Sequence, residues 1–129
     1  GGDGKDYTYG GTGKDTLSGD KGDDYLAGEA GDDWLYCQAG EDTLVGGAGE
    51  DNYVFNKIYD GAETIIGYNY EEGDVIQIYG EQYDVTSIDQ LAYDESNGAI
   101  YANEGDIDPI CYVDTETTTG FDISYVELV

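Results

Sequence analysis

Residues 1–54 read, in successive nines, GGDGKDYTY, GGTGKDTLS, GDKGDDYLA, GEAGDDWLY, CQAGEDTLV and GGAGEDNYV. The fourth position is glycine in every unit, at Gly4, Gly13, Gly22, Gly31, Gly40 and Gly49. The sixth position is aspartate in every unit, at Asp6, Asp15, Asp24, Asp33, Asp42 and Asp51. The eighth position is leucine in the inner units, at Leu17, Leu26, Leu35 and Leu44. A period this regular indicates a repeat architecture in which each unit packs against its neighbours.

Each unit combines a glycine-rich turn with a short alternating segment. Glycine lets the backbone adopt positive φ, and the segments Thr16-Leu17-Ser18 and Trp34-Leu35-Tyr36 place one apolar side chain inward between two outward ones. Strands this short bury little alone, so stacked units must share the leucine row as a core. We therefore expect an all-β fold, a right-handed parallel β-roll in which two units form one coil.

This geometry stacks the aspartates in two columns. One edge carries Asp6, Asp24 and Asp42, and the other carries Asp15, Asp33 and Asp51. Carboxylates at one strand spacing repel unless a cation lies between them. Carboxylate and carbonyl oxygens in a flexible arrangement suit Ca²⁺ better than Mg²⁺, which keeps more of its water. The sequence therefore predicts several bound calcium ions along both edges.

The six units resemble the haemolysin-type calcium-binding nonapeptide repeat of RTX proteins, GGxGxDxUx with U a large apolar residue. The resemblance implies that each ion is held between two stacked turns by the position-six aspartate and the backbone carbonyls of the glycine-rich turn. Units one and three, three and five, two and four, and four and six would then enclose about four sites. The pattern is broken where Cys37 replaces the first glycine of unit five, and where Asp20, Glu29 and Gln38 stand at position two.

The register of nine is lost after residue 54, and we expect residues 55–129 to continue the roll and to cap it. A solenoid end exposes an apolar cross-section that needs covering. Alternation predicts strands near 64–68, 74–79, 99–102, 110–113 and 123–128, a hairpin turn at 96–98 and a short helix over 87–92. The stretches Glu63-Thr64-Ile65-Ile66-Gly67-Tyr68 and Gly73-Asp74-Val75-Ile76 are similar to the C-terminal roll of serralysin-type secreted proteins.

Further acids extend the predicted metal sites. Asp60 lies nine residues after Asp51 and could close the ladder, and Asp74 could do the same from the next turn. The loop with Asn103, Asp106 and Asp108 is oxygen-rich, so it is either a separate ion site or a solvated acidic loop.

Composition excludes several classes of function. The chain has 129 residues, 30 Asp and Glu against 4 Lys and Arg, no histidine and a formal net charge of -26. Four basic residues cannot build a nucleic-acid surface, and histidine-based catalysis is impossible. No segment is long and apolar enough to span a membrane, and the chain starts mid-pattern without Met, as a piece of a longer protein would. We expect a non-catalytic module.

Two sets of side chains leave alternatives open. Cys37, at a turn position expected to face an edge, and Cys111 form either a disulfide or two free thiols. The aromatic residues at positions seven and nine should point outward, where they bind sugar rings, dock another domain, or are covered by an upstream domain or by the cap; they are Tyr7, Tyr9, Tyr25, Trp34 and Tyr36.

The function expected from the sequence is a calcium-dependent folding module of a secreted, extracellular bacterial protein. The carboxylates repel in a low-calcium cytosol, and the roll assembles when ions bind outside the cell. By resemblance, the export route is type I secretion, and Glu127-Leu128-Val129 is similar to the tail of such substrates. The expected partners are calcium ions, an upstream domain and the secretion machinery. The alternatives are a polysaccharide-binding accessory module and a surface of an adhesin or toxin.

Overall fold

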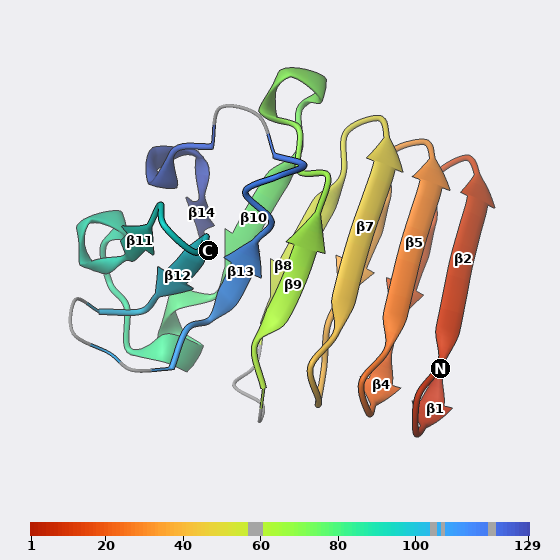
Figure 1. Ribbon diagram of the computed structural model, residues 1–129, viewed down its shortest axis with the longest axis horizontal. Helices are drawn as coiled ribbons and strands as arrows, with labels where there is room; N and C mark the ends of the chain where they lie inside the picture. The colour runs from red at the N-terminus through yellow and green to blue at the C-terminus, as the bar shows by residue number, and fades with distance from the viewer. Residues whose placement is uncertain (57–60, 104–105, 107, 119–120) are drawn as a thin grey trace.

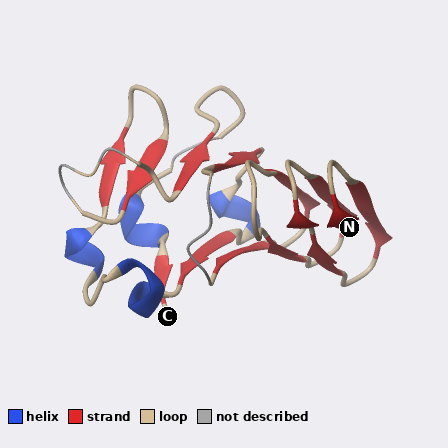
Figure 2. Ribbon diagram, turned by 90° about the horizontal axis from the view of Figure 1, so that it is seen from below, coloured by secondary structure: helices blue, strands red, loops and turns tan. Residues whose placement is uncertain are grey.

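The computed structural model describes residues 1–56, 61–103, 106, 108–118 and 121–129. Through residues 25–78 consecutive strands alternate between two sheets, so the chain winds as a β-solenoid (Figure 1). One of these sheets has seven strands and the other has five. Figure 2 shows the strands of the repeat region in two facing layers.

The repeat region contains eight short strands. They are β1 (Gly2–Asp3), β2 (Tyr7–Thr12), β3 (Thr16–Ser18), β4 (Asp20–Lys21), β5 (Tyr25–Ala30), β6 (Trp34–Tyr36), β7 (Thr43–Ala48) and β8 (Asn52–Phe55). Strands β1 and β4 pair in a small sheet of two strands along one edge.

The strand register confirms that two nonapeptides form one coil. Tyr7 pairs with Tyr25 in parallel, and Tyr25 pairs with Thr43. In the other sheet Thr16 pairs with Trp34. Each residue therefore lies beside its equivalent two units later, which places units one, three and five on one edge and units two, four and six on the other.

The position-eight side chains form the predicted core. Leu26, Leu35 and Leu44 have no exposed surface, and Leu17 is 3% exposed. Tyr53 takes this position in unit six and is also fully buried. Because the strands stack in register, these side chains form one continuous apolar row rather than separate clusters.

The second half continues the coil before it leaves the repeat pattern. Strand β9 (Glu63–Ile66) pairs in parallel with β7, and β10 (Val75–Ile78) pairs in parallel with β8. Strand β13 (Cys111–Val113) then adds to β9, and β14 (Glu127–Leu128) adds to β10. The parallel β-roll predicted from the repeats thus extends beyond residue 54.

In the second half the predicted hairpin is confirmed, whereas the predicted short helix is reduced to one turn. Strands β11 (Ala92–Asp94) and β12 (Ala99–Tyr101) are antiparallel and enclose the predicted turn at 96–98. The helix expected over 87–92 is a single 3-10 turn, η3 (Ile88–Gln90), because β11 already begins at Ala92. The other 3-10 turns are η1 (Tyr70–Glu72), η2 (Gly80–Tyr83) and η4 (Ile123–Tyr125).

The strand predicted over 123–128 is wrong in its first half. The Asp122 side chain accepts a hydrogen bond from the Ser124 backbone N–H and starts η4, so the extended backbone is confined to β14. A local side-chain bond to the backbone here overrides the apolar alternation.

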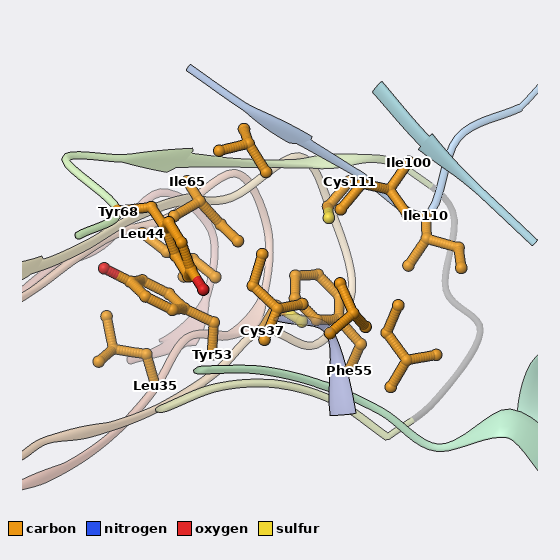
Figure 3. Close-up of a cluster of buried hydrophobic side chains, with 14 of the residues drawn as sticks. Leu35, Cys37, Leu44, Tyr53, Phe55, Ile65, Tyr68, Ile100, Ile110 and Cys111 are labelled. Atoms are coloured by element: carbon orange, nitrogen blue, oxygen red, sulfur yellow. The ribbon is translucent and has the colours of Figure 1, made fainter. Parts of the chain in front are cut away.

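Both cysteines lie in the core of the second half. Cys37 is 4% exposed and Cys111 is fully buried, and both are free thiols (Figure 3). The expectation that Cys37 faces an edge is wrong, because its side chain points inward and its Sγ contacts the Val54 carbonyl oxygen at 3.4 Å. Of the outward aromatic residues, Tyr7 and Tyr9 are the most exposed, at 63% and 59%.

Candidate metal centres

The position-six aspartates form two columns, as predicted. Each lies at the end of a turn, immediately before the strand that carries the buried position-eight residue. Asp24 and Asp42 are 3% and 2% exposed, and Asp33 and Asp51 are fully buried. The turns thus place these carboxylates inside the edges of the roll rather than on its surface.

One carboxylate oxygen of each inner aspartate is held by the neighbouring coil. Oδ1 of Asp24 accepts a hydrogen bond from the Asp6 backbone N–H at 2.7 Å. The same bond recurs from Asp15 to Asp33 at 2.8 Å, from Asp24 to Asp42 at 2.9 Å and from Asp33 to Asp51 at 3.0 Å. This ladder fixes the orientation of four of the six carboxylates, those of Asp24, Asp33, Asp42 and Asp51.

The second carboxylate oxygen is buried and has no partner in five of the six units. These atoms are Oδ2 of Asp6, Asp15, Asp24, Asp33 and Asp51. Within the described part of the chain, no lysine forms an ion pair with any of these carboxylates. A buried anionic oxygen without a partner is strongly unfavourable, so the site is chemically incomplete until a cation binds.

The first glycine of each turn leaves room beside this oxygen. A Cβ added at Gly28 would lie 2.2 Å from Asp33 Oδ2 and 2.6 Å from the Gly46 carbonyl oxygen. A Cβ added at Gly1 would meet Asp6 Oδ2 at 2.5 Å and the Gly19 carbonyl oxygen at 2.6 Å. The unpartnered carboxylate oxygen and a carbonyl oxygen of the next coil therefore border the same small space.

The position-four glycines pack the turns closely. Gly31 has φ +131, and a Cβ there would lie 1.9 Å from the carbonyl oxygen of Gly13 in the preceding coil. Gly22, Gly40 and Gly49 meet the preceding position-four glycine in the same way. Four of the six predicted metal-site glycines are thus required by the spacing of the coils, whereas a Cβ at Gly4 or Gly13 would meet nothing within 4 Å. Their assignment as carbonyl ligands stays a prediction.

Asp74 continues the second column, and Glu63 continues the first. Asp74 Oδ1 accepts from the Asp51 N–H at 3.1 Å, and its Oδ2 accepts from the Asn69 N–H at 2.8 Å. Glu63 lies before Thr64, which pairs with Thr43, so Glu63 occupies the position that follows Asp42 in the column. As calcium ligands, Asp74 and the six repeat aspartates stay predictions.

The sequence analysis missed Glu63, although a signal was present. Gly61-Ala62-Glu63-Thr64-Ile65 has the order of Gly40-Glu41-Asp42-Thr43-Leu44, but three additional residues separate it from unit six. The proposed ligand Asp60 lies outside the described residues. The loop of Asn103, Asp106 and Asp108 is only partly described, and there Asp106 Oδ2 accepts from the Asn103 N–H at 3.0 Å.

Burial sets the titration of the acids at the inner end of the columns. The pKa of Asp51 is raised to about 6, chiefly by burial and also by the nearby carboxylates of Asp74 and Asp33, while a hydrogen bond from the Asp33 backbone opposes the rise. Burial raises the pKa of Glu63 to about 7. It also raises the pKa of the Cys37 and Cys111 thiols well above the ordinary value, so neither thiol is present as a thiolate at neutral pH.

The donor set fits calcium. All candidate ligand atoms are oxygens, from carboxylates and main-chain carbonyls, which are the ligands that Ca²⁺ prefers. In the part of the chain that the structure describes, no three acidic or thiol side chains converge on one point. Each ion would therefore need backbone carbonyls beside the aspartates. The chemistry that calcium supplies when bound is positive charge between adjacent carboxylates.

The fold and the site together define a calcium-binding β-roll. The family model of the RTX calcium-binding nonapeptide repeat, which comprises four copies of the repeat, matches residues 1–35 and again residues 18–53. The repeats in the first part of this chain are RTX repeats, which bind calcium and are typical of secreted bacterial proteins. No curated protein matches the chain. None of the described helices has the length and apolar character needed to cross a membrane.

Asp33→Asn tests the buried carboxylate directly. Removing the charge at the unpartnered Oδ2 should raise the calcium concentration at the midpoint of binding by roughly tenfold or more, as expected for loss of a metal ligand. The matched control is Asp32→Asn, which makes the same charge change at an exposed residue whose Oδ1 still accepts from the Glu50 N–H. Isothermal titration calorimetry measures both, and equal midpoints for the two variants would contradict the assignment.

Glu63→Gln tests the cost of burying the other column acid. Its pKa is 4.5 in an exposed chain and about 7 in the folded protein, so folding favours the protonated form. The ionised side chain therefore lowers stability progressively as pH rises from about 4.5 to about 7, by about 3 kcal/mol above that range. Urea unfolding at fixed saturating calcium should show Glu63→Gln to be more stable than the wild type at pH 8, with little difference at pH 4.5. Exposed Glu81→Gln is the control, and a pH-independent effect of Glu63→Gln would contradict this reasoning.

Proposed function

We propose that this chain is a calcium-dependent folding module that stabilises the C-terminal end of a secreted bacterial protein. The observation that carries the proposal is the set of five buried Oδ2 atoms without a partner. They lie between stacked coils, so a cation bound there contacts only the assembled roll and has no equivalent site in the unfolded chain. Binding free energy then becomes folding free energy.

The electrostatics of the chain supports the same role. The formal net charge of -26 opposes compaction, and the columns concentrate carboxylates at the spacing of neighbouring strands. Without calcium the repulsion favours an extended chain, which suits passage through a narrow export channel. Extracellular calcium sites of roughly 10⁻⁴ to 10⁻³ M affinity are sufficient outside the cell and stay empty in the cytosol.

Residues 55–129 serve as the cap in this proposal. Strands β13 and β14 cover the last coil in the two sheets, and Ile100, Cys111 and Val113 are fully buried against it. The core of the roll is thus closed at this end by non-repeat sequence. The module is non-catalytic, and its expected partners are calcium, an upstream domain of the same protein and a type I secretion system.

A calcium titration followed by far-ultraviolet circular dichroism tests the proposal. In excess chelator the chain should lack strand signal, and added Ca²⁺ should induce it cooperatively because several sites stack on each other. Mg²⁺ at the same concentration should not replace Ca²⁺, since it keeps more of its water. A chain already rich in strand in chelator, and unchanged by calcium, would overturn the proposal.

A second candidate function is recognition of polysaccharide. It is favoured by Tyr7 and Tyr9, which are largely exposed on the outer face of β2, with Tyr25 packed between the two rings at a centroid distance of 6.0 Å from each. Exposed aromatic rings stack on sugars. If this surface binds glycans, neutral or anionic oligosaccharides should change the tyrosine and tryptophan fluorescence of the calcium-loaded protein, and Tyr7→Ala should abolish the change. No response to any glycan would exclude this candidate.

A further inference from the structure

The turn of unit five differs from the other five turns. It begins with Cys37-Gln38, where the remaining units begin with glycine followed by a residue of positive φ. Positive φ is kept at position two even where the residue is Asp20 (φ 77) or Glu29 (φ 78). Gln38 does not have positive φ. The backbone of the fifth turn therefore takes a different path at the two positions that border the metal site elsewhere.

The carboxylate of unit five has no oxygen left over. Asp42 Oδ1 accepts from the Asp24 N–H at 2.9 Å, as in the other units, but its Oδ2 accepts from the Gln38 N–H at 3.3 Å. In all five other repeats the equivalent Oδ2 is buried and unpartnered. In unit five the Gln38 N–H therefore occupies the carboxylate oxygen that the other turns leave free for a cation.

The side chain of Cys37 fills the space that glycine leaves open. At Gly28 and Gly46 an added Cβ would lie 2.2 Å from the unpartnered Oδ2 of the same unit. Unit five carries a real Cβ at this position, and its thiol points into the apolar core beside Phe55 (Figure 3). A carboxylate oxygen and a side chain cannot share this space, which accounts for the different placement of Asp42.

The carbonyl of Cys37 has also moved away from the preceding turn. An added Cβ at Gly10 would lie 2.7 Å from the carbonyl oxygen of Gly28 in the next coil. The corresponding point at Gly19 has three Asp24 atoms as its nearest neighbours, the farthest at 3.2 Å, so the Cys37 carbonyl oxygen lies beyond that distance. The fifth turn therefore offers neither the free carboxylate oxygen of the other units nor the close carbonyl oxygen that borders the space beside Gly1, Gly10 and Gly28.

We propose that the fifth turn, Cys37 to Asp42, binds no calcium, so that the edge formed by units one, three and five holds fewer ions than the edge formed by units two, four and six. This inference rests on the proposed calcium-dependent folding. The fifth turn is stabilised instead by the Gln38 to Asp42 hydrogen bond and by the buried Cys37 side chain. On that edge, calcium therefore stabilises the turns before unit five, and the fifth turn is held by the apolar core.

Asp42→Asn and Asp51→Asn form a matched pair for the test. The two aspartates lie in adjacent repeats, are 2% and 0% exposed, and each accepts an N–H bond from the preceding coil. Isothermal titration calorimetry with calcium alone should show that Asp51→Asn loses a site or weakens binding by roughly tenfold or more, while Asp42→Asn changes the midpoint by less than about twofold. An equal loss in both variants would overturn the inference.

A restoring variant keeps the test independent of damage to the fold. Cys37→Gly combined with Gln38→Gly rebuilds the glycine pair of unit six in unit five, and it should increase the number of calcium ions bound per chain. The control Cys37→Ser retains a Cβ and should leave that number unchanged. An unchanged number in a double variant that still folds with calcium would overturn the inference. If the wild type binds no calcium at all, the proposed function fails instead, so the two failures are distinguishable.

Discussion

The structure depends on how each repeated carboxylate divides its two oxygens. In Asp24, Asp33 and Asp51, Oδ1 accepts a hydrogen bond from a backbone N–H of the preceding coil, which sets the stacking register, and Oδ2 is left buried without a partner. The hydrogen bond alone would make the aspartate an ordinary structural residue. The unpartnered oxygen makes the same residue unfavourable in the folded state unless a cation is present. In these units the stacking bond and the need for a cation therefore come from one side chain, whereas Asp42 keeps the stacking bond and has its second oxygen satisfied by the Gln38 N–H.

The glycines contribute to the same site because they have no side chain, which leaves space where the turns meet. At position four they allow a close approach between coils, and at position one they keep the volume beside Oδ2 free. A larger residue at position one changes the placement of both the carboxylate of its unit and its own carbonyl oxygen, as Cys37 illustrates in unit five. The metal site of this fold is consequently a property of the packing distance between turns, which explains why no cluster of acidic side chains marks it within the described residues.

The sequence allowed the coil length, the two aspartate columns and the leucine core to be predicted, because all three follow from a strict period of nine. Glu63 was missed because three additional residues hide its alignment with Asp42, and only the pairing of β9 with β7 reveals it. The inward orientation of Cys37 was also missed. Its position in the repeat predicted a turn residue at an edge, whereas the core of the second half, formed by residues far along the chain, determines where the thiol lies.

The break in the pattern at unit five has a physical reason in the end of the solenoid. Turns inside the array lie between similar turns that can share a cation, whereas the last coils pack against non-repeat strands and need apolar contacts. Cys37 provides such a contact and at the same time removes the space for an ion, and Glu63 replaces the next aspartate in a buried position that raises its pKa to about 7. Near that pH a proton neutralises part of the Glu63 charge, a route that is less open to the aspartates of the column, whose ordinary pKa is lower.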